Sequence, residues 1–526
     1  MSEDARAATI GGVQVALLNP PGLKPRWGLQ MHTPNLPIGL AYVAAALRRA
    51  GHQVSVLDAV GEAPDRITPA PFRTDLMVQG LSARELAARV PADARLVGVT
   101  CMFSSQWLIA RELLRELRAR LPRALLVAGG EHMSALPEHV LETSPADLVV
   151  VGEGEETAVE LAAAVAAGGD PAGVPGVVSR GPDGRARRAA PRRRTCAVDE
   201  IEPPAWDLFH VERYIERQQM HGVHRGRAMP ILGTRGCPYQ CTFCSSPQMW
   251  TQRWIPRDPA RLVDELAALQ ARYGATDFHF QDLTAIVRKD WIIAFAREVL
   301  RRGLRITYQL PSGTRSEAID REVAGWLYRS GCRNMAYAPE SGSDQLRKQV
   351  KKQVKLDRLL ASIEGALAEG LSLSCFFVIG FPDETEATLR ETLALVRQLA
   401  RMGLHDIGVA KFVPYPGSAL FARALAEGVI RLDDEYFLSL DAYAQGAHTV
   451  SFCPAISPRR LHTWQLRLLS EFYARSLLRH PLRTTRAVVK VLSTGEEETR
   501  FAKMVRDVAR TRLRWTRMLR PREEPA

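Results

Sequence analysis

The chain has 526 residues, of which 46% are hydrophobic and 24% are charged, and its net charge is +12. A chain of this length can form two or three domains with substantial cores, and its composition excludes a disordered or fibrous protein. No apolar run reaches the length of a membrane span, and the N-terminus Met-Ser-Glu-Asp-Ala-Arg lacks the apolar segment of a secretory signal.

The cysteine distribution indicates a reducing environment. Five of the eight cysteines are scattered and lie mostly within apolar runs, namely Cys101, Cys196, Cys332, Cys375 and Cys453. They are typical of buried thiols and not of a disulfide framework. We therefore expect a cytoplasmic protein.

Residues 1–170 are predicted to form a Rossmann-like α/β domain, because short apolar strands alternate with helices. The predicted strands are 13–19, 52–58, 95–103, 124–130 and 147–152, and the predicted helices are 39–50, 81–90, 106–120, 137–143 and 157–167. Near-continuous apolar strands are typical of a parallel sheet that is covered on both faces. Ligands of such sheets bind at the carboxyl ends of the strands.

Small and polar residues follow three of these strands. They are Ser104 and Ser105 after the third strand, Gly129, Gly130 and Glu131 after the fourth, and Gly152 and Glu153 after the fifth. Paired glycines let a ligand approach the backbone closely, although each segment alone could be a tight turn. Three such segments in register favour a ligand, and the absence of G-x-G-x-x-G after the first strand disfavours a dinucleotide.

With these three segments, the N-terminal half resembles the cobalamin-binding domain of corrinoid enzymes. The resemblance implies that the residues just named contact cobalamin. Many such domains carry Asp-x-His-x-x-Gly after the first strand, and its His ligates the cobalt. Here that position reads Asn19-Pro-Pro-Gly-Leu-Lys. Either His32 in the following loop substitutes, or water or an apolar side chain such as Trp27 covers the lower face of the cobalt.

Residues 171–228 are predicted to be a linker. Gly181-Pro-Asp-Gly184 indicates a turn, and the arginines from Arg185 to Arg194 form a basic stretch on or beside a hairpin. Aromatic residues that could stack on bases are not interleaved with these arginines, so we expect no nucleic-acid partner.

Residues 229–420 are predicted to form a partial (β/α)6 barrel. The predicted strands are 229–234, 277–281, 305–310, 334–338, 372–379 and 406–412, and the predicted helices are 260–273, 289–302, 317–330, 355–369 and 384–402. The active site of such a barrel lies at the carboxyl ends of its strands.

Three cysteines follow the first barrel strand with the spacing Cys-x₃-Cys-x₂-Cys: Cys237, Cys241 and Cys244. Thiolates at this spacing select an iron–sulfur cluster or zinc. A structural zinc site needs four ligands, and no fourth Cys or His lies close by in the sequence. Three ligands on a four-iron cluster would leave one iron open for another molecule.

Polar residues also end the later barrel strands, at the rim that carries the cysteines. They are Gln281 and Asp282, Ser312 and Arg315, Glu340 and Ser341, Gly380 with the segment to Glu384, and the segment 414–417. Each alone could be a turn or a helix cap.

This half resembles the radical S-adenosylmethionine (radical SAM) superfamily, whose signature is the cysteine spacing, with Glu340-Ser-Gly and Gly380-Phe-Pro-Asp-Glu-Thr385 as further matches. The resemblance implies that the three cysteines hold a catalytic [4Fe-4S] cluster and that S-adenosylmethionine binds the open iron. Phe243 would pack near the adenine, and Glu340, Ser312 and Arg315 would contact the amino, ribose or carboxylate groups. Gln281, Asp282, Ser341 and Gly380 are further candidate cofactor contacts.

Together the two halves resemble the cobalamin-dependent branch of this superfamily. That resemblance implies a C-methyltransferase, in which a 5′-deoxyadenosyl radical activates a substrate carbon and methylcobalamin supplies the methyl group. It also implies an external electron donor of the flavodoxin or ferredoxin type. The alternatives are a cyclase of the magnesium-protoporphyrin ester type without methyl transfer and, against the evidence of the cysteine loop, a non-catalytic cobalamin sensor.

Residues 421–526 are predicted to be largely helical and basic. From Arg479 to the end the chain carries 13 Lys or Arg and 6 Asp or Glu, a net charge of +7. Arginines interleaved with Leu513, Trp515, Met518 and Leu519 favour either contact with the inner membrane surface or a helix packed on the barrel. The sequence leaves the small-molecule substrate open between a lipid, a tetrapyrrole pigment, a peptide and an antibiotic or other natural-product precursor.

Overall fold

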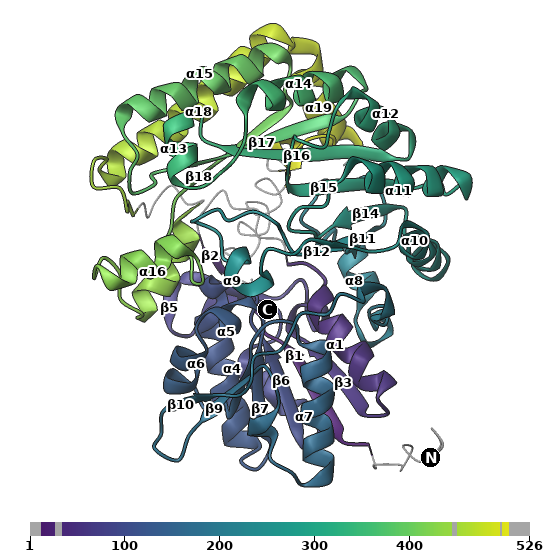
Figure 1. The fold of residues 1–526 in the computed structure, drawn as a ribbon, viewed down its shortest axis with the longest axis vertical. Helices are drawn as coiled ribbons and strands as arrows, with labels where there is room; N and C mark the ends of the chain where they lie inside the picture. Colours follow the sequence, from purple (N-terminus) through teal and green to yellow (C-terminus); the bar gives the residue numbers. More distant parts are fainter. Residues whose placement is uncertain (1–11, 27–33, 444–449, 495–496, 504–505, 507–526) are drawn as a thin grey trace, which may run out of the picture.

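The computed structural model describes residues 12–26, 34–443, 450–494, 497–503 and 506 (Figure 1). The N-terminal half forms the lower part of the molecule in this view, the barrel forms the upper part, and α9 (Ser246–Trp250) lies between them.

The N-terminal half contains a seven-stranded sheet with the order β10-β9-β8-β7-β6-β1-β3. Its members are β1 (Gln14–Asn19), β3 (Gln53–Asp58), β6 (Leu96–Thr100), β7 (Leu125–Gly129), β8 (Leu148–Val150), β9 (Val177–Arg180) and β10 (Ala186–Arg188). The first five are parallel, and β9 and β10 continue the sheet antiparallel. The parallel order places a topological switch point between β1 and β6, where α/β sheets bind their ligands.

Helices cover both faces of this sheet because successive strand residues point to opposite sides. Val15 and Leu17 belong to one core cluster and Ala16 and Leu18 to another. The helices are α1 (Ile38–Arg49), α2 (Ala59–Glu62), α3 (Ala83–Ala88), α4 (Trp107–Arg120), α5 (Glu131–Ala135), α6 (Pro137–Thr143) and α7 (Glu155–Ala167). This architecture confirms the Rossmann-like fold expected from the apolar strands.

Two features of the N-terminal half differ from the sequence-based expectation. A small antiparallel sheet of β2 (Gly22–Pro25), β5 (Arg73–Gln79) and β4 (Ile67–Ala70) was not predicted. β2 and β4 have only four residues each, and Pro69 lies in the edge strand β4, so the sequence signal is weak. In addition, β9, β10 and α8 (Val211–Glu216) lie in the stretch predicted to be a linker.

The second half is a parallel six-stranded sheet with the order β11-β14-β15-β16-β17-β18. The strands are β11 (Ala228–Ile231), β14 (Asp277–Phe280), β15 (Thr307–Thr314), β16 (Cys332–Glu340), β17 (Ser372–Ile379) and β18 (Asp406–Lys411). The edge strands β11 and β18 are not paired with each other within the described chain, so the barrel is partial, as predicted. The helices α10 (Pro259–Tyr273), α11 (Lys289–Arg301), α12 (Arg321–Arg329), α13 (Asp344–Gln349), α14 (Leu356–Ala368) and α15 (Glu386–Met402) accompany it.

Two barrel strands extend farther toward the rim than the sequence predicted. β15 continues to Thr314 and β16 to Glu340, each with a register shift near its carboxyl end. Ser312 and Glu340 therefore lie on strands and not on the loops that follow them. Irregular pairing of this kind re-aims side chains beside functional sites and leaves no simple alternation in the sequence.

The chain after the barrel forms α16 (Ala419–Ala426), α17 (Asp434–Ser439), α18 (Pro458–Arg479) and α19 (Pro481–Thr494). α18 packs on α15 and β18, whereas α17 packs on the N-terminal half. There, Phe437 lies 5.5 Å from the His132 ring, and Arg111 pairs with Asp434 at 2.8 Å. Within the described ranges, every helix is too short or too polar to cross a bilayer.

Candidate active site

The cysteine loop begins with a tightly built turn after β11. Gly236 has a φ of +89°, and a Cβ there would lie 2.1 Å from the Arg253 carbonyl oxygen, so only glycine fits. Asp282 accepts hydrogen bonds from the Gly233 N–H at 3.1 Å and the Thr234 hydroxyl at 2.6 Å. Asp282, which was predicted to contact a cofactor, thus fixes the residues that lead into the cysteine loop.

The three clustered cysteines are half-buried and unpaired by disulfides. Burial raises the pKa of Cys241 to about 11, and Lys352 and Arg315 act in the opposite direction. Burial also raises the pKa of Cys237 and of Cys244. As free thiols they are protonated at neutral pH, so binding of iron would release protons.

The arrangement of these thiols favours a cluster over a single metal ion. Among the described residues, no group of three or more His, Cys, Asp or Glu side chains is positioned to hold one ion. In a four-iron cluster each thiolate binds a different iron, so the sulfurs need not converge on one point. The zinc alternative therefore lacks a ligand set in the part of the chain that the structure describes.

Glu340 and Arg315 lie at the rim beside the cysteine loop. Glu340 is buried, has a φ of +64° and pairs with Lys352 at 2.9 Å. The Arg315 guanidinium stacks over Tyr239 at 3.8 Å and donates to the Gln353 carbonyl. Its Nε and Nη2 also pair with the Glu317 carboxylate at 3.1 and 2.7 Å, whereas its buried Nη1 has no hydrogen-bond partner. A buried guanidinium with an unused donor is suited to binding an anionic group of a ligand.

The other predicted rim residues have varied surroundings. Phe243 lies 5.4 Å from Phe381 and belongs to an apolar cluster at the rim. The Ser341 hydroxyl lies 3.1 Å from that of Thr392, and the Gly380 N–H donates to the Glu384 carboxylate. Ser341 and Gly380 thus shape turns, whereas Ser312 on β15 is half-buried.

Several buried polar atoms at this rim have no partner within the protein. They are Thr242 Oγ1, Gln281 Nε2, Arg315 Nη1, Ser316 Oγ, Ser343 Oγ and Glu384 Oε1. Buried polar groups are nearly always hydrogen-bonded, so these atoms indicate a missing polar ligand. S-adenosylmethionine, with its amino, carboxylate and ribose groups, is chemically suited to them.

The glycines that end the strands of the N-terminal half leave open backbone. A Cβ added at Gly129 or Gly152 would meet nothing within 4 Å, whereas Gly130 packs against the Cys101 carbonyl. A flat, large ligand could approach the first two, which fits a corrinoid ring. The buried Nε2 atom of His132, at the same edge, has no hydrogen-bond partner.

Ser104, one of the two serines predicted to contact cobalamin, makes contacts within the protein. The Ser104 N–H donates to the Tyr415 hydroxyl at 2.9 Å, and its Oγ lies 2.9 Å from His132 Nδ1. Ser105 is buried beside it. Tyr415 belongs to the rim segment after β18, so this contact joins the two halves.

Glu131 and Glu153 also join the two halves. Glu131 accepts a hydrogen bond from Ser245, the residue after Cys244. Arg235, two residues before Cys237, pairs with Glu153 at 3.1 Å and Glu155 at 2.6 Å. The sequence pattern could not reveal these contacts, because the partners lie roughly 80 to 110 residues apart and belong to different sheets.

Some predicted residues lie outside the described chain. His32 and Trp27, considered for the lower face of the cobalt, fall within residues 27–33. The interleaved apolar residues of the basic tail, Leu513, Trp515, Met518 and Leu519, fall within residues 507–526.

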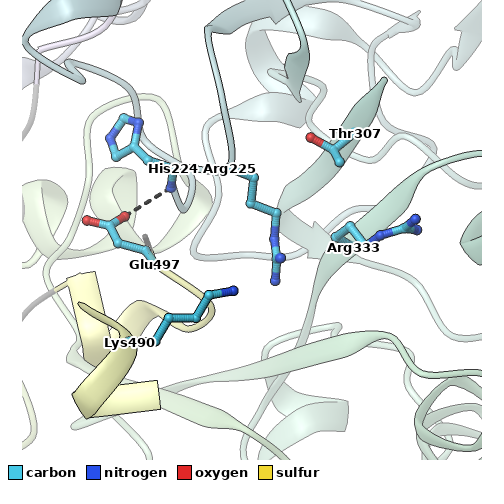
Figure 2. Close-up of a pocket in the computed structure, with 6 residues that line it drawn as sticks. All are labelled: His224, Arg225, Thr307, Arg333, Lys490 and Glu497. Carbon is cyan, nitrogen blue, oxygen red and sulfur yellow. Dashed lines mark hydrogen bonds between the residues drawn. The ribbon is translucent and has the colours of Figure 1, made fainter. Parts of the chain in front are cut away.

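A cavity of about 120 Å³ lies at the opposite end of the barrel (Figure 2). It is lined by His224, Arg225, Thr307, Arg333, Lys490 and Glu497. Thr307 is the first residue of β15, so the cavity is at the amino ends of the strands. Arg225 donates to Asn334 and Lys490 pairs with Glu498, which assigns these cations structural partners.

Comparisons with known proteins agree with this geometry. Residues 32–162 match the B12 binding domain family and residues 231–396 match the radical SAM superfamily. An uncharacterised methyltransferase of Pyrococcus horikoshii, PH0819, is 29% identical over 75% of this chain and 79% of its own length. Cytidylyl-2-hydroxyethylphosphonate methyltransferase of Streptomyces wedmorensis is 27% identical over 82% of this chain and 85% of its own.

The chain is also similar to a cyclase and to a solved methyltransferase structure, at lower sequence identity. An anaerobic magnesium-protoporphyrin IX monomethyl ester cyclase of Rubrivivax gelatinosus is 24% identical over 73% of this chain and 65% of its own length. The solved structure of the radical SAM methyltransferase TsrM of Kitasatospora setae, with tryptophan and a SAM analogue, has a TM-score of 0.63 at 22% identity. It covers 88% of this chain and 89% of that one, and it shares the fold.

The fold, the cysteine loop and the second family match show that the chain is a radical SAM enzyme. Because a B12 binding domain precedes the barrel, it belongs to the cobalamin-dependent branch of that superfamily. The enzyme class and the three cofactors expected from the sequence are confirmed at this level. The roles of individual residues stay predictions.

Proposed function

We propose that the chain is a C-methyltransferase that acts on a small-molecule substrate, with a [4Fe-4S] cluster, S-adenosylmethionine and cobalamin. The main support for the proposal is a direct contact between the two predicted cofactor sites. Glu131, after the fourth strand of the B12 domain, bonds to Ser245 beside Cys244. Relatives named as methyltransferases over most of this chain support methyl transfer.

In this proposal Cys237, Cys241 and Cys244 hold the cluster. When bound, the cluster supplies the electron that cleaves S-adenosylmethionine, and cobalamin carries the methyl group. Arg315 binds the carboxylate of S-adenosylmethionine through its unpaired Nη1, and Gln281 donates to its polar groups. The apolar cluster around Phe243 excludes water beside the adenine, as a radical reaction requires.

Residues of the N-terminal half have two roles in the proposal. Gly129 and Gly152 let the corrinoid ring approach the backbone, because no atoms occupy the space beside them. Ser104, Glu131 and Glu153 hold this surface against the barrel through Tyr415, Ser245 and Arg235, and Ser105 and Gly130 are their neighbours in the chain.

Anaerobic reconstitution of the full chain with iron, sulfide and cobalamin tests the proposal. With S-adenosylmethionine, a methyltransferase should form S-adenosylhomocysteine as well as 5′-deoxyadenosine, whereas a cyclase should form only the latter. Cys241→Ala should reduce 5′-deoxyadenosine formation at least about a hundredfold, since a ligand of the radical-generating centre is lost. Cys196, which is exposed and lies outside the Cys-x₃-Cys-x₂-Cys motif, provides the control, because Cys196→Ala should match the wild type.

Three results would contradict the proposal. An intact four-iron spectrum in the variant lacking Cys237, Cys241 and Cys244 would exclude the cluster assignment. Formation of 5′-deoxyadenosine without S-adenosylhomocysteine would favour the cyclase, a reaction for which relatives such as the Rubrivivax enzyme are named. A chain that forms neither product would be a cobalamin sensor.

The proposal also covers the electron donor of the enzyme and its location in the cell. We propose that a flavodoxin or ferredoxin in the cytoplasm supplies the electron, with no nucleic acid involved. We also propose that the basic segment 507–526 contacts the inner membrane surface, because six arginines there alternate with apolar residues. Co-sedimentation with anionic vesicles measures that contact.

A further inference from the structure

The short segment Val350–Gln353, which follows α13, lies against the cysteine loop. The Thr242 N–H, next to Cys241, donates to the Val350 carbonyl at 3.0 Å. At the other end of the segment, the Gln353 carbonyl accepts from Arg315, whose guanidinium stacks on Tyr239 of the loop. One end of the segment is therefore hydrogen-bonded to the loop that carries the thiols, and the other end contacts that loop through Arg315.

This segment turns one of its two lysines inward. Lys351 has a φ of +52° and is exposed, whereas Lys352 is buried, with 9% of its surface accessible. The Lys352 N–H donates to the Arg347 carbonyl at 2.8 Å, which fixes the turn. A left-handed residue other than glycine is held only when its surroundings require it. The fold therefore directs the Lys352 side chain toward the rim.

The buried ammonium has one carboxylate partner. Lys352 Nζ lies 2.9 Å from Glu340 Oε1, and the two side chains are 10% and 8% exposed. A carboxylate at this distance offsets the cost of burying the ammonium, so the Lys352 side chain stays charged. Burying an ion pair often contributes little net stability, which suggests that this pair is retained for function.

Resting on the proposed function, we propose that Lys352 is a fixed positive charge that makes a cluster on Cys237, Cys241 and Cys244 easier to reduce. Adding an electron to a cluster adds one negative charge, and local charge and burial are among the features that set cluster potentials. In a water-poor site this attraction is much stronger than in bulk solvent. Loss of Lys352 would also leave the Glu340 carboxylate without its partner beside the cluster.

The test is a redox titration of the reconstituted full chain, with the reduced cluster measured by electron paramagnetic resonance. We expect Lys352→Met to lower the ratio of reduced to oxidised cluster about tenfold at a fixed potential, which equals a shift of about 59 mV for one electron. Lys351→Met, which removes the exposed neighbouring charge, should leave the titration unchanged. Lys352→Arg, which keeps the charge, should remain close to the wild type.

Glu340→Gln gives a second and opposite readout. It removes the negative partner and keeps the ammonium, so the cluster should be easier to reduce than in the wild type. This variant keeps the inference testable even when Lys352→Met loads too little iron to titrate. Equal titrations for the wild type and either charge-removing variant would overturn the inference. A wild-type chain that loads no four-iron cluster would instead refute the proposed function on which it rests.

Discussion

At the scale of single residues, the barrel keeps three carboxyl groups in environments that favour the neutral form. Burial raises the pKa of Asp282 and of Asp406 to about 6 and that of Glu384 to about 7. Glu384 accepts from the Gly380 N–H through one oxygen, while its buried Oε1 has no partner. The folded protein therefore favours the protonated form of the Glu384 carboxyl group, so protonation of Glu384 stabilises the turn after β17.

The stability of the protein should consequently fall as the pH rises through these values. The folded pKa of Glu384 is above its ordinary value of 4.5, so its contribution is complete below about pH 4.5 and is lost toward pH 7. The change corresponds to roughly 3 kcal/mol from this group. Glu384→Gln should flatten the pH dependence of the unfolding temperature between pH 5 and 7. An unaltered slope in the variant would show that Glu384 titrates normally.

At the scale of elements, the chain after α19 belongs partly to the barrel. The N–H groups of Arg500 and Phe501 donate to the Asp406 carboxylate at 2.8 and 3.2 Å, and Arg500 also donates to the Pro311 carbonyl at 2.7 Å. Asp406 begins β18, so this segment closes the amino-terminal end of the barrel. The described part of this tail therefore packs on the barrel, whereas the predicted membrane contact concerns residues 507–526 and stays a prediction.

Two truncations separate these parts. A chain that ends after Arg506 keeps the contacts of Asp406 and should unfold at the wild-type temperature, but it should no longer pellet with anionic vesicles. A chain that ends after Thr494 should be destabilised, at about 1–3 kcal/mol for each buried polar group left unpaired. Undiminished pelleting of the chain that ends after Arg506 would exclude the membrane contact of residues 507–526.

At the scale of the whole molecule, buried charges hold the two cofactor-binding halves together. Arg235 is 8% exposed and pairs with Glu153 and Glu155, which are 10% and 14% exposed. Arg194 lies 3.6 Å from Glu153 and completes the group. Because Arg235 directly precedes the cysteine loop, these pairs set how the loop faces the B12 domain.

Removing Arg235 should therefore affect both halves. Arg235→Met leaves two carboxylates buried without their main partner and should cost about 3–5 kcal/mol. The unfolding temperature and the cobalamin bound per chain should both decrease, and adding Glu153→Gln and Glu155→Gln should restore them in part. Arg188→Met, which removes an exposed pair with Glu138, is the control and should have almost no effect. A normal amount of bound cobalamin in Arg235→Met would mean that the pairs do not orient the domain.

Local patterns in the sequence were sufficient to predict the architecture of both halves. Alternating apolar strands and helices predicted both sheets. The spacing of Cys237, Cys241 and Cys244 predicted an iron–sulfur or zinc site, and the resemblance to the radical SAM superfamily predicted the class of enzyme. These signals are periodic or short-range, so they can be read without knowing which segments meet. The small sheet of β2, β4 and β5 was missed because its short strands carry a proline and little alternation.

Only the tertiary structure decided which charged residues pair. Glu131 and Glu153 were predicted to contact cobalamin, yet their carboxylates bond to Ser245 and Arg235 of the other half. Lys352 is one of several lysines in the run 348–355, and only the turn at Lys351 places its side chain on Glu340. The sequence determined the fold and the cysteine site because periodicity and ligand spacing are local, and its resemblance to known families indicated the cofactors. Ion-pair partners depend on long-range topology that brings distant segments together.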